Sequence, residues 1–205
     1  VAGHRSRHGD GNGLAQSMHH TILPLARGRD KRCQVHWGIA SFEYRFGYRP
    51  TGMWIPEMAV DYETLEVLSE ANIRYVILSE EQVTGDLSYG AGPYVLDLPG
   101  GRSMAAFIRE NGLSNALAFS MPPADQAKDW LNDAMTNRRP GALSLIATDG
   151  ETFGHHHKHG SEVLRRLVTP DPDDTFVLTT LDRELQDAGP MPKLDFRENT
   201  AWSCS

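Results

Sequence analysis

The residues with the clearest chemical potential lie in one run, residues 148–160. It contains two carboxylates, three glycines and four histidines. The run follows the apolar residues 143–147, which we predict to form a buried strand that opens into a functional loop. In α/β folds, catalytic groups collect at strand ends of this kind. Asp149 is therefore the first candidate for a catalytic carboxylate.

A second carboxylate, Glu57, follows the apolar residues 53–55 and is preceded by Pro56, whose fixed φ stiffens the backbone beside it. Two carboxylates at the carboxyl ends of two parallel strands can converge on one substrate bond. Glycoside hydrolysis uses such a pair, one as nucleophile or base and the other as proton donor. An ordinary surface glutamate and an ordinary Asp-Gly turn are the alternatives at these two positions.

The histidines that follow Asp149 admit three interpretations. His155 and His159 are four residues apart and would share a helix face, so together with Asp149 they could bind zinc. Alternatively, His155 and His156 contact sugar hydroxyls and tune the nearby carboxylates, with Glu151 as a supporting group. The third interpretation is a solvated helix start. The absence of a nearby cysteine and of a His-Glu-x-x-His pattern argues against zinc.

Three more side chains are candidates for substrate binding. His20 belongs to a histidine pair followed by an apolar run and Pro24, which could place an imidazole at a cleft. Trp54 and Trp202 each offer a flat apolar face on which a sugar ring can stack. A structural turn and buried tryptophans are the ordinary alternatives. The sequence contains no Walker loop, no Gly-x-Ser-x-Gly elbow and no dinucleotide fingerprint after a strand.

Alternating strands and helices must position these residues. Predicted strands that alternate with predicted helices imply parallel βα units. They are too few for a complete eight-unit barrel, which typically needs about 250 residues. We therefore predict an α/β fold that is an incomplete barrel, with an irregular segment over roughly the first fifteen residues. The predicted strands are residues 53–55, 75–78, 94–98, 104–108, 143–147 and 176–179, and the predicted helices are residues 35–46, 62–71, 127–135 and a segment after Gly154.

Bulk properties exclude several classes of protein. A net charge of −7 and a pI near 5.7 argue against nucleic acid or an anionic membrane as partner. No apolar stretch approaches the roughly 18 residues of a membrane span, and no apolar signal segment opens the chain. The two cysteines, Cys33 and Cys204, are expected to be reduced thiols, which fits a cytoplasmic protein.

Taken together, these motifs resemble glycoside hydrolase family 57, the α-amylase and 4-α-glucanotransferase family. The closest resemblance is to its uncharacterised branch with an additional domain of unknown function. The resembling segments occur in the family's order and cover most of the chain. They are residues 20–25, 37–43 with 46–47, 52–61, 64–68, 112–114, 148–157 and 199–204.

The resemblance implies a (β/α)7 barrel that cleaves or transfers α-glucosidic bonds of α-glucans with retention, without metal or cofactor. It implies Glu57 as the nucleophile and Asp149 as the general acid/base. A retaining pair is expected to lie about 5–5.5 Å apart, against about 6.5–9.5 Å in an inverting enzyme. The family's N-terminal His-x-Pro strand and C-terminal helices are not in this sequence. Residues 1–205 are therefore expected to be one portion of a catalytic domain.

The sequence is compatible with two other functions. A metal-dependent polysaccharide deacetylase also uses an incomplete barrel, and Asp149, His155 and His159 would then be its metal ligands. A non-catalytic, sugar-binding remnant is the other.

Overall fold

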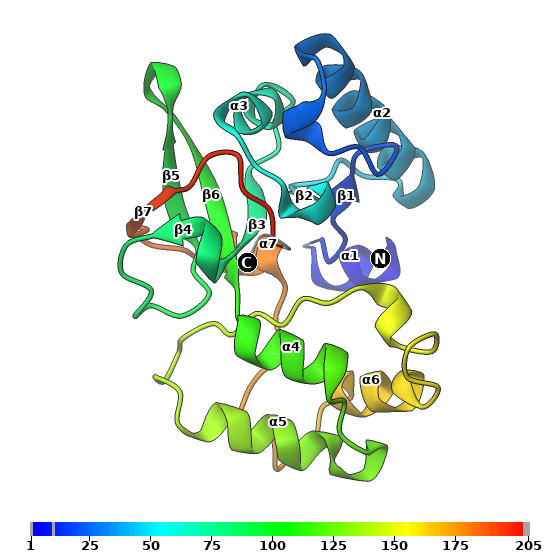
Figure 1. Cartoon of the computed structure of the whole chain (residues 1–205). Coiled ribbons are helices and arrows are strands. Elements are labelled where there is room, and N and C mark those ends of the chain that lie inside the picture. The colour runs from blue at the N-terminus through cyan, green and yellow to red at the C-terminus, as the bar shows by residue number, and fades with distance from the viewer. Residues whose placement is uncertain (1, 10, 203–205) are drawn as a thin grey trace. The chain divides into compact units, whose positions relative to one another are not determined.

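The computed structural model describes residues 2–9 and 11–202, which divide into two compact units (Figure 1). The first unit contains the described residues up to 108 and from 180 onward, and the second contains residues 109–179. Each unit buries its own apolar cluster. The two units are therefore described separately.

A seven-stranded sheet forms the framework of the first unit, in the order β1-β2-β3-β6-β5-β7-β4. β1, β2 and β3 are parallel, so their carboxyl ends lie at the same edge of the sheet. β5 and β6 form an antiparallel hairpin, whereas β7 pairs with β5 in parallel and with β4 in antiparallel orientation. The strands are β1 (Ala15–Gln16), β2 (Gly52–Trp54), β3 (Tyr75–Ser79), β4 (Val83–Thr84), β5 (Tyr94–Leu98), β6 (Arg102–Arg109) and β7 (Lys193–Phe196).

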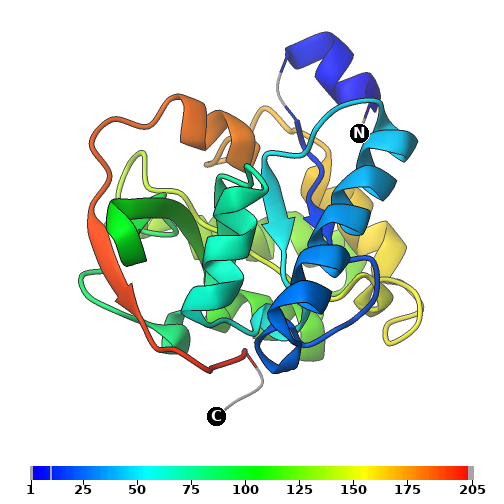
Figure 2. The same ribbon diagram turned by 90° about the horizontal axis from the view of Figure 1, so that it is seen from above.

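Two helices, α2 (Gly28–Phe46) and α3 (Tyr62–Glu70), lie side by side and contact the sheet (Figure 2). Apolar residues at helical spacing, such as Val35, Ile39 and Phe42 of α2, are buried in the same cluster as the strands. The shorter helices α1 (Ala2–His8) and α7 (Leu181–Gln186) also belong to this unit. The parallel strands thus have one apolar layer of helix packed against them.

Local sequence signals explain where these helices begin and end. Gly47 ends α2 in the left-handed conformation, with φ of 73°, which glycine adopts without steric cost. Asp61 caps α3, because its carboxylate accepts a hydrogen bond of 2.7 Å from the backbone of Thr64. Gly38 allows close packing, since a Cβ there would lie 1.8 Å from the carbonyl oxygen of Gln16. α2 therefore contacts the backbone of β1 directly.

The second unit contains α4 (Asn111–Phe119), α5 (Ala127–Thr136) and α6 (Gly160–Val168). Their apolar faces pack together without a sheet of their own in residues 110–179. The buried residues of this apolar cluster are Leu117, Met121, Ala127, Leu131, Val163 and Leu167.

No helix within residues 2–9 and 11–202 is long and apolar enough to cross a membrane.

Several predicted elements are confirmed. The predicted helix over residues 35–46 is the carboxyl-terminal part of α2, and the predicted helices over 62–71 and 127–135 correspond to α3 and α5. The predicted strands at 53–55, 75–78, 94–98 and 104–108 correspond to β2, β3, β5 and β6. The segment after Gly154 contains α6.

Three local predictions are wrong. Residues 143–147 form no strand, and only Leu143 is part of an isolated bridge; the Leu145 carbonyl accepts from the Glu110 backbone (2.9 Å) and the Ala147 amide donates to the Ser114 hydroxyl (3.1 Å). Residues 176–179 also form no strand, and Val177 is 90 % exposed. The opening segment, predicted to be irregular, contains α1. Of the two cysteines, Cys33 is half-buried and Cys204 lies outside the described residues.

Candidate active site

Glu57 lies on a strained turn directly after β2. The backbone leaves the strand through Ile55 and enters a 3-10 turn at Pro56–Met58, in which Glu57 and Met58 have positive φ values of 57° and 48°. Left-handed backbone at residues other than glycine costs about 1–3 kcal/mol each and is retained where the surroundings enforce it. Pro56 and Met58 are buried on either side, so the turn is held firmly while Glu57 stays partly exposed.

Both carboxylate oxygens of Glu57 accept hydrogen bonds. The Nε2 atom of His20 donates to Oε1 at 2.9 Å, and the indole Nε1 of Trp202 donates to Oε2 at 2.8 Å. The backbone amide of Trp202 also donates to the Glu57 carbonyl, at 2.9 Å. These contacts bring together residues from three distant segments of the chain.

The electrostatic surroundings favour the ionised form of Glu57. The hydrogen bond from Trp202, followed by that from His20, holds the pKa of the Glu57 carboxyl below its usual value and outweighs the opposing effect of burial. The Glu57 side chain is 35 % exposed and that of His20 is 68 % exposed. The carboxylate is thus charged, oriented and still reachable by a ligand.

Trp54 and Trp202 form an aromatic pair beside this carboxylate. Their ring centroids are 5.7 Å apart and the rings meet edge to face at 84°. Both tryptophans are partly exposed, so apolar ring surface remains available next to Glu57. The first unit therefore brings together four predicted site residues: His20, Trp54, Glu57 and Trp202.

Two residues of this site were missed by the sequence analysis. Gln82 is buried beneath the turn, and its side-chain amide donates to the Met58 carbonyl (2.8 Å) and to the Thr200 hydroxyl (3.2 Å). The sequence does contain a signal for Gln82, because Ser79 and Gln82 have the spacing of a capping box, which predicts a hydrogen bond between them. No local signal marks Thr200.

The other predicted site residues belong to the second unit. Asp149 lies directly before the 3-10 turn Gly150–Thr152, and it does not follow a strand as the sequence predicted. Its side chain is exposed and makes no hydrogen bond or ion pair with the described residues. Glu151, in contrast, accepts from the Nε2 of His156 at 3.2 Å, and the His155 and His156 rings lie 5.0 Å apart. Within this loop, the carboxylate paired with a histidine is Glu151.

The histidine cluster does not converge on a common point. In residues 2–9 and 11–202, no group of three or more His, Cys, Asp or Glu side chains is arranged to hold a metal ion. His157 is tied instead to α4, since its Nε2 lies 2.8 Å from the Ala118 carbonyl. Asp149, His155 and His159 are thus not gathered as the deacetylase alternative requires.

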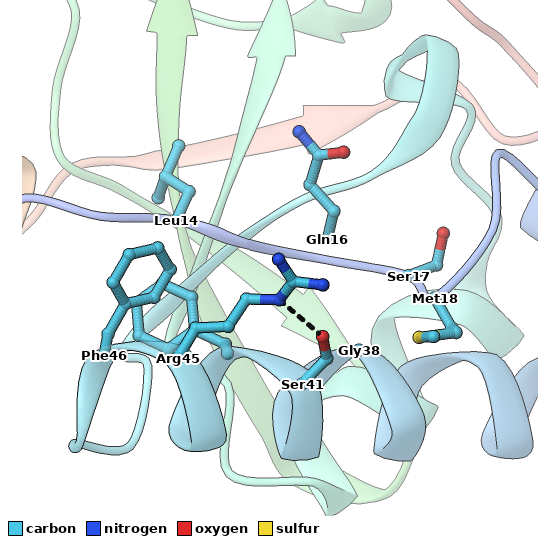
Figure 3. Close-up of a pocket in the computed structure, with 9 residues that line it drawn as sticks. Leu14, Gln16, Ser17, Met18, Gly38, Ser41, Arg45 and Phe46 are labelled. Carbon is cyan, nitrogen blue, oxygen red and sulfur yellow. Dashed lines mark hydrogen bonds between the residues drawn. The ribbon is translucent and has the colours of Figure 1, made fainter.

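A shallow pocket of about 170 Å³ lies elsewhere in the first unit, between β1 and α2 (Figure 3). In it the Arg45 Nε donates to the Ser41 hydroxyl at 3.3 Å, and Phe46 and Leu14 lie at the same end of the lining. None of the predicted site residues lines it. This pocket is therefore separate from the site around Glu57.

The parallel strands β1 to β3, with a held carboxylate after β2, define an incomplete α/β barrel with an acidic site at a strand end. A family model described as "Glycosyl hydrolase family 57" matches residues 8–189. The chain belongs to glycosyl hydrolase family 57. The resemblance recognised from the motifs is thereby confirmed.

Individual relatives agree with this assignment. "Alpha-amylase 1" of Dictyoglomus thermophilum is 25% identical over 151 residues, which cover 69% of this chain and 20% of that protein. The solved structure of the α-amylase AmyC from Thermotoga maritima matches with a TM-score of 0.74 at 15% identity, over 93% of this chain and 51% of that one. A GH57 branching enzyme from Thermococcus kodakaraensis, crystallised with glucose, matches with a TM-score of 0.74 at 16% identity, over 97% and 50%.

This chain thus spans about half of each of those solved chains and a fifth of the curated amylase. The similarity in structure covers nearly all of the chain despite low identity, and it confirms the predicted fold class. The fold is a mixed α/β portion of the barrel found in family 57 enzymes.

Proposed function

We propose that the protein is a retaining glycoside hydrolase or transglycosylase that acts on α-glucosidic bonds of α-glucans. The observation that carries this proposal is the ionised Glu57, oriented by His20 and Trp202 after a parallel strand. Membership of family 57 supports the class of reaction. The similarity to an α-amylase and to a branching enzyme supports an α-glucan as substrate.

In the proposed reaction Glu57 is the nucleophile. Its carboxylate attacks the anomeric carbon, the glycosidic bond breaks, and a covalent glucosyl-enzyme forms with inverted configuration. The donors His20 and Trp202 keep the carboxylate ionised and aimed before attack. The faces of Trp54 and Trp202 offer surface for a sugar ring.

Asp149 is the proposed general acid/base. It protonates the leaving oxygen in the first step and then deprotonates water, or the hydroxyl of an acceptor sugar, in the second. Glu151, His155 and His156 follow it in the same loop and are proposed to contact the substrate. This assignment treats residues 1–205 as one portion of a catalytic domain, with no metal in the reaction.

The proposal is tested by the stereochemistry of the first products. The protein, expressed from its complete reading frame, is incubated with maltooligosaccharides while proton NMR follows the newly formed reducing ends. We expect the α-anomer to appear first, with mutarotation to the β-anomer afterwards. Initial formation of the β-anomer would contradict retention. Binding without turnover would support the non-catalytic alternative.

Trp202→Phe tests how the nucleophile is kept ionised. The variant keeps an aromatic ring beside Trp54 but removes the N–H that donates to Glu57. Because that donor lowers the pKa of Glu57, its loss raises the pKa, and the acidic limb of the kcat/KM profile moves to higher pH. We expect kcat/KM at neutral pH to fall about 10- to 100-fold, as a lost hydrogen bond to a charged group predicts.

Trp54→Phe is the matched control, since Trp54 makes no hydrogen bond to Glu57 in the structure. This variant removes an indole N–H from the same aromatic pair. Its acidic limb is expected to stay where it is in the parent protein, whatever happens to KM. An unchanged acidic limb in Trp202→Phe would contradict the role given to the Trp202 indole.

A further inference from the structure

Gln82 makes no hydrogen bond to Glu57, but it is hydrogen-bonded to both backbone segments that surround the Glu57 carboxylate. Its side chain is 1 % exposed, so its amide must find partners within the protein. The Oε1 atom accepts from the Ser79 backbone amide at 3.0 Å, which fixes the orientation of the amide group. The Nε2 atom is therefore the donor, and it faces the Met58 carbonyl at 2.8 Å and the Thr200 hydroxyl at 3.2 Å.

The first of these bonds acts on the strained turn. Met58 follows the nucleophile candidate and shares its left-handed backbone, with φ of 48°. A turn of this kind relaxes unless its neighbours enforce it. The hydrogen bond from Gln82 to the Met58 carbonyl is one such restraint, and it comes from the turn after β3, next to β2 in the sheet.

The second bond acts on the segment that supplies Trp202. This segment leaves β7 at Arg197, whose amide donates to the Gln82 carbonyl at 2.7 Å. Two bonds then join it to Val60: the Asn199 amide donates to the Val60 carbonyl at 2.8 Å, and the Val60 amide donates to the Thr200 carbonyl at 2.9 Å. Gln82 is thus bonded to this segment twice, through its carbonyl and through its side chain.

We propose that Gln82 is a positioning residue for the Glu57 site: one side-chain amide holds the Glu57–Met58 turn and the Thr200–Trp202 segment in a fixed relation, so that the Trp202 indole meets the carboxylate. The inference rests on the proposed function for its kinetic consequence. Its structural consequence, the state of the Glu57–Trp202 hydrogen bond, can be measured without any activity.

Gln82→Met tests this role, because methionine is similar in size and has no amide. We expect the indole N–H resonance of Trp202, assigned by its absence in Trp202→Phe, to follow the titration of Glu57 in the parent protein. In Gln82→Met the Trp202 indole is held less firmly and its effect on the pKa of Glu57 is weaker. The titration of Glu57 therefore moves to higher pH. We expect kcat to fall about 10- to 100-fold with little change in KM, as a small misplacement of a catalytic group predicts.

Thr200→Val provides a second route to the same result. It removes the hydroxyl that accepts from Gln82 and leaves the amide itself in place. The titration is expected to move in the same direction by a smaller amount. In a double-mutant cycle the two changes should not be additive, because both remove one shared contact. This variant keeps the inference testable if Gln82→Met does not fold.

Tyr75→Phe is the control for a purely structural role. It removes another buried hydrogen bond of the first unit, from the Tyr75 hydroxyl to the Asp182 carboxylate at 2.8 Å. We expect it to lower the melting temperature but to leave the Trp202 resonance and the kinetics unchanged. If Gln82→Met behaved like this control, with a lower Tm and an unmoved titration, the inference would be overturned. A moved titration in a protein that turns over no α-glucan would contradict the proposed function and leave the positioning role intact.

Discussion

Glu57→Gln is expected to reduce kcat on α-glucans by on the order of 10⁴- to 10⁶-fold, the range seen when a catalytic nucleophile is removed. Glutamine has nearly the same shape as glutamate but carries no negative charge for attack on the anomeric carbon. The fold should survive the change, since Glu57 is partly exposed and its backbone contact to Trp202 remains. Circular dichroism and a melting curve establish this before the kinetics are measured.

Glu57→Ala with added azide distinguishes a nucleophile from a supporting residue. The truncated side chain leaves room for a small anion on the face from which Glu57 is proposed to attack. We expect azide to restore turnover of an activated aryl α-glucoside and to yield the β-glucosyl azide, with configuration inverted. Activity that persists in Glu57→Gln, without azide, would remove Glu57 from the mechanism.

The second large effect is expected at Asp149. Asp149→Asn removes the proposed proton donor to the leaving oxygen, a contribution of typically 10²- to 10⁴-fold. The loss should therefore be large for maltooligosaccharides, whose leaving group needs a proton. It should be much smaller for a dinitrophenyl α-glucoside, whose leaving group departs as an anion.

Azide again identifies the role, with the opposite stereochemical result. In Asp149→Ala, azide should attack the covalent glucosyl-enzyme and yield the α-glucosyl azide, with overall retention. Glu151→Ala is the matched control, because Glu151 lies two residues away and pairs with His156, and azide should not restore turnover in this variant. Equal losses on both types of substrate in Asp149→Asn, or an anion-rescue pattern seen only in the Glu151 variant, would contradict the assignment of Asp149.

The site around Glu57 was predictable in part because its signals are local. An apolar strand followed by Pro56 and Glu57 can be read from consecutive residues, and the structure places that turn after β2. The partner of the carboxylate could not be read in this way, because Trp202 is 145 positions from Glu57 in the sequence. Trp202 was a candidate only for the shape of its ring and through the family resemblance.

The wrong strand before Asp149 has a related cause. Four apolar residues among five fit a buried strand, and periodicity alone cannot separate that from an irregular segment held by other groups. In this chain the backbone of residues 143–147 bonds to Glu110 and Ser114, more than thirty positions earlier, at the start of α4. The composition of residues 143–147 does not indicate that Glu110 and Ser114 are their hydrogen-bond partners.

The return of the chain from β7 to Glu57 has a consequence for biosynthesis. Translation proceeds at about 5–20 residues per second, so the 145 positions between Glu57 and Trp202 correspond to a delay of about 7–29 s on the ribosome. During that interval β2 and β3 can already pair, but the carboxylate has no indole donor. In a nascent chain, β2 and β3 can therefore be paired while Glu57 still lacks its hydrogen bond from Trp202.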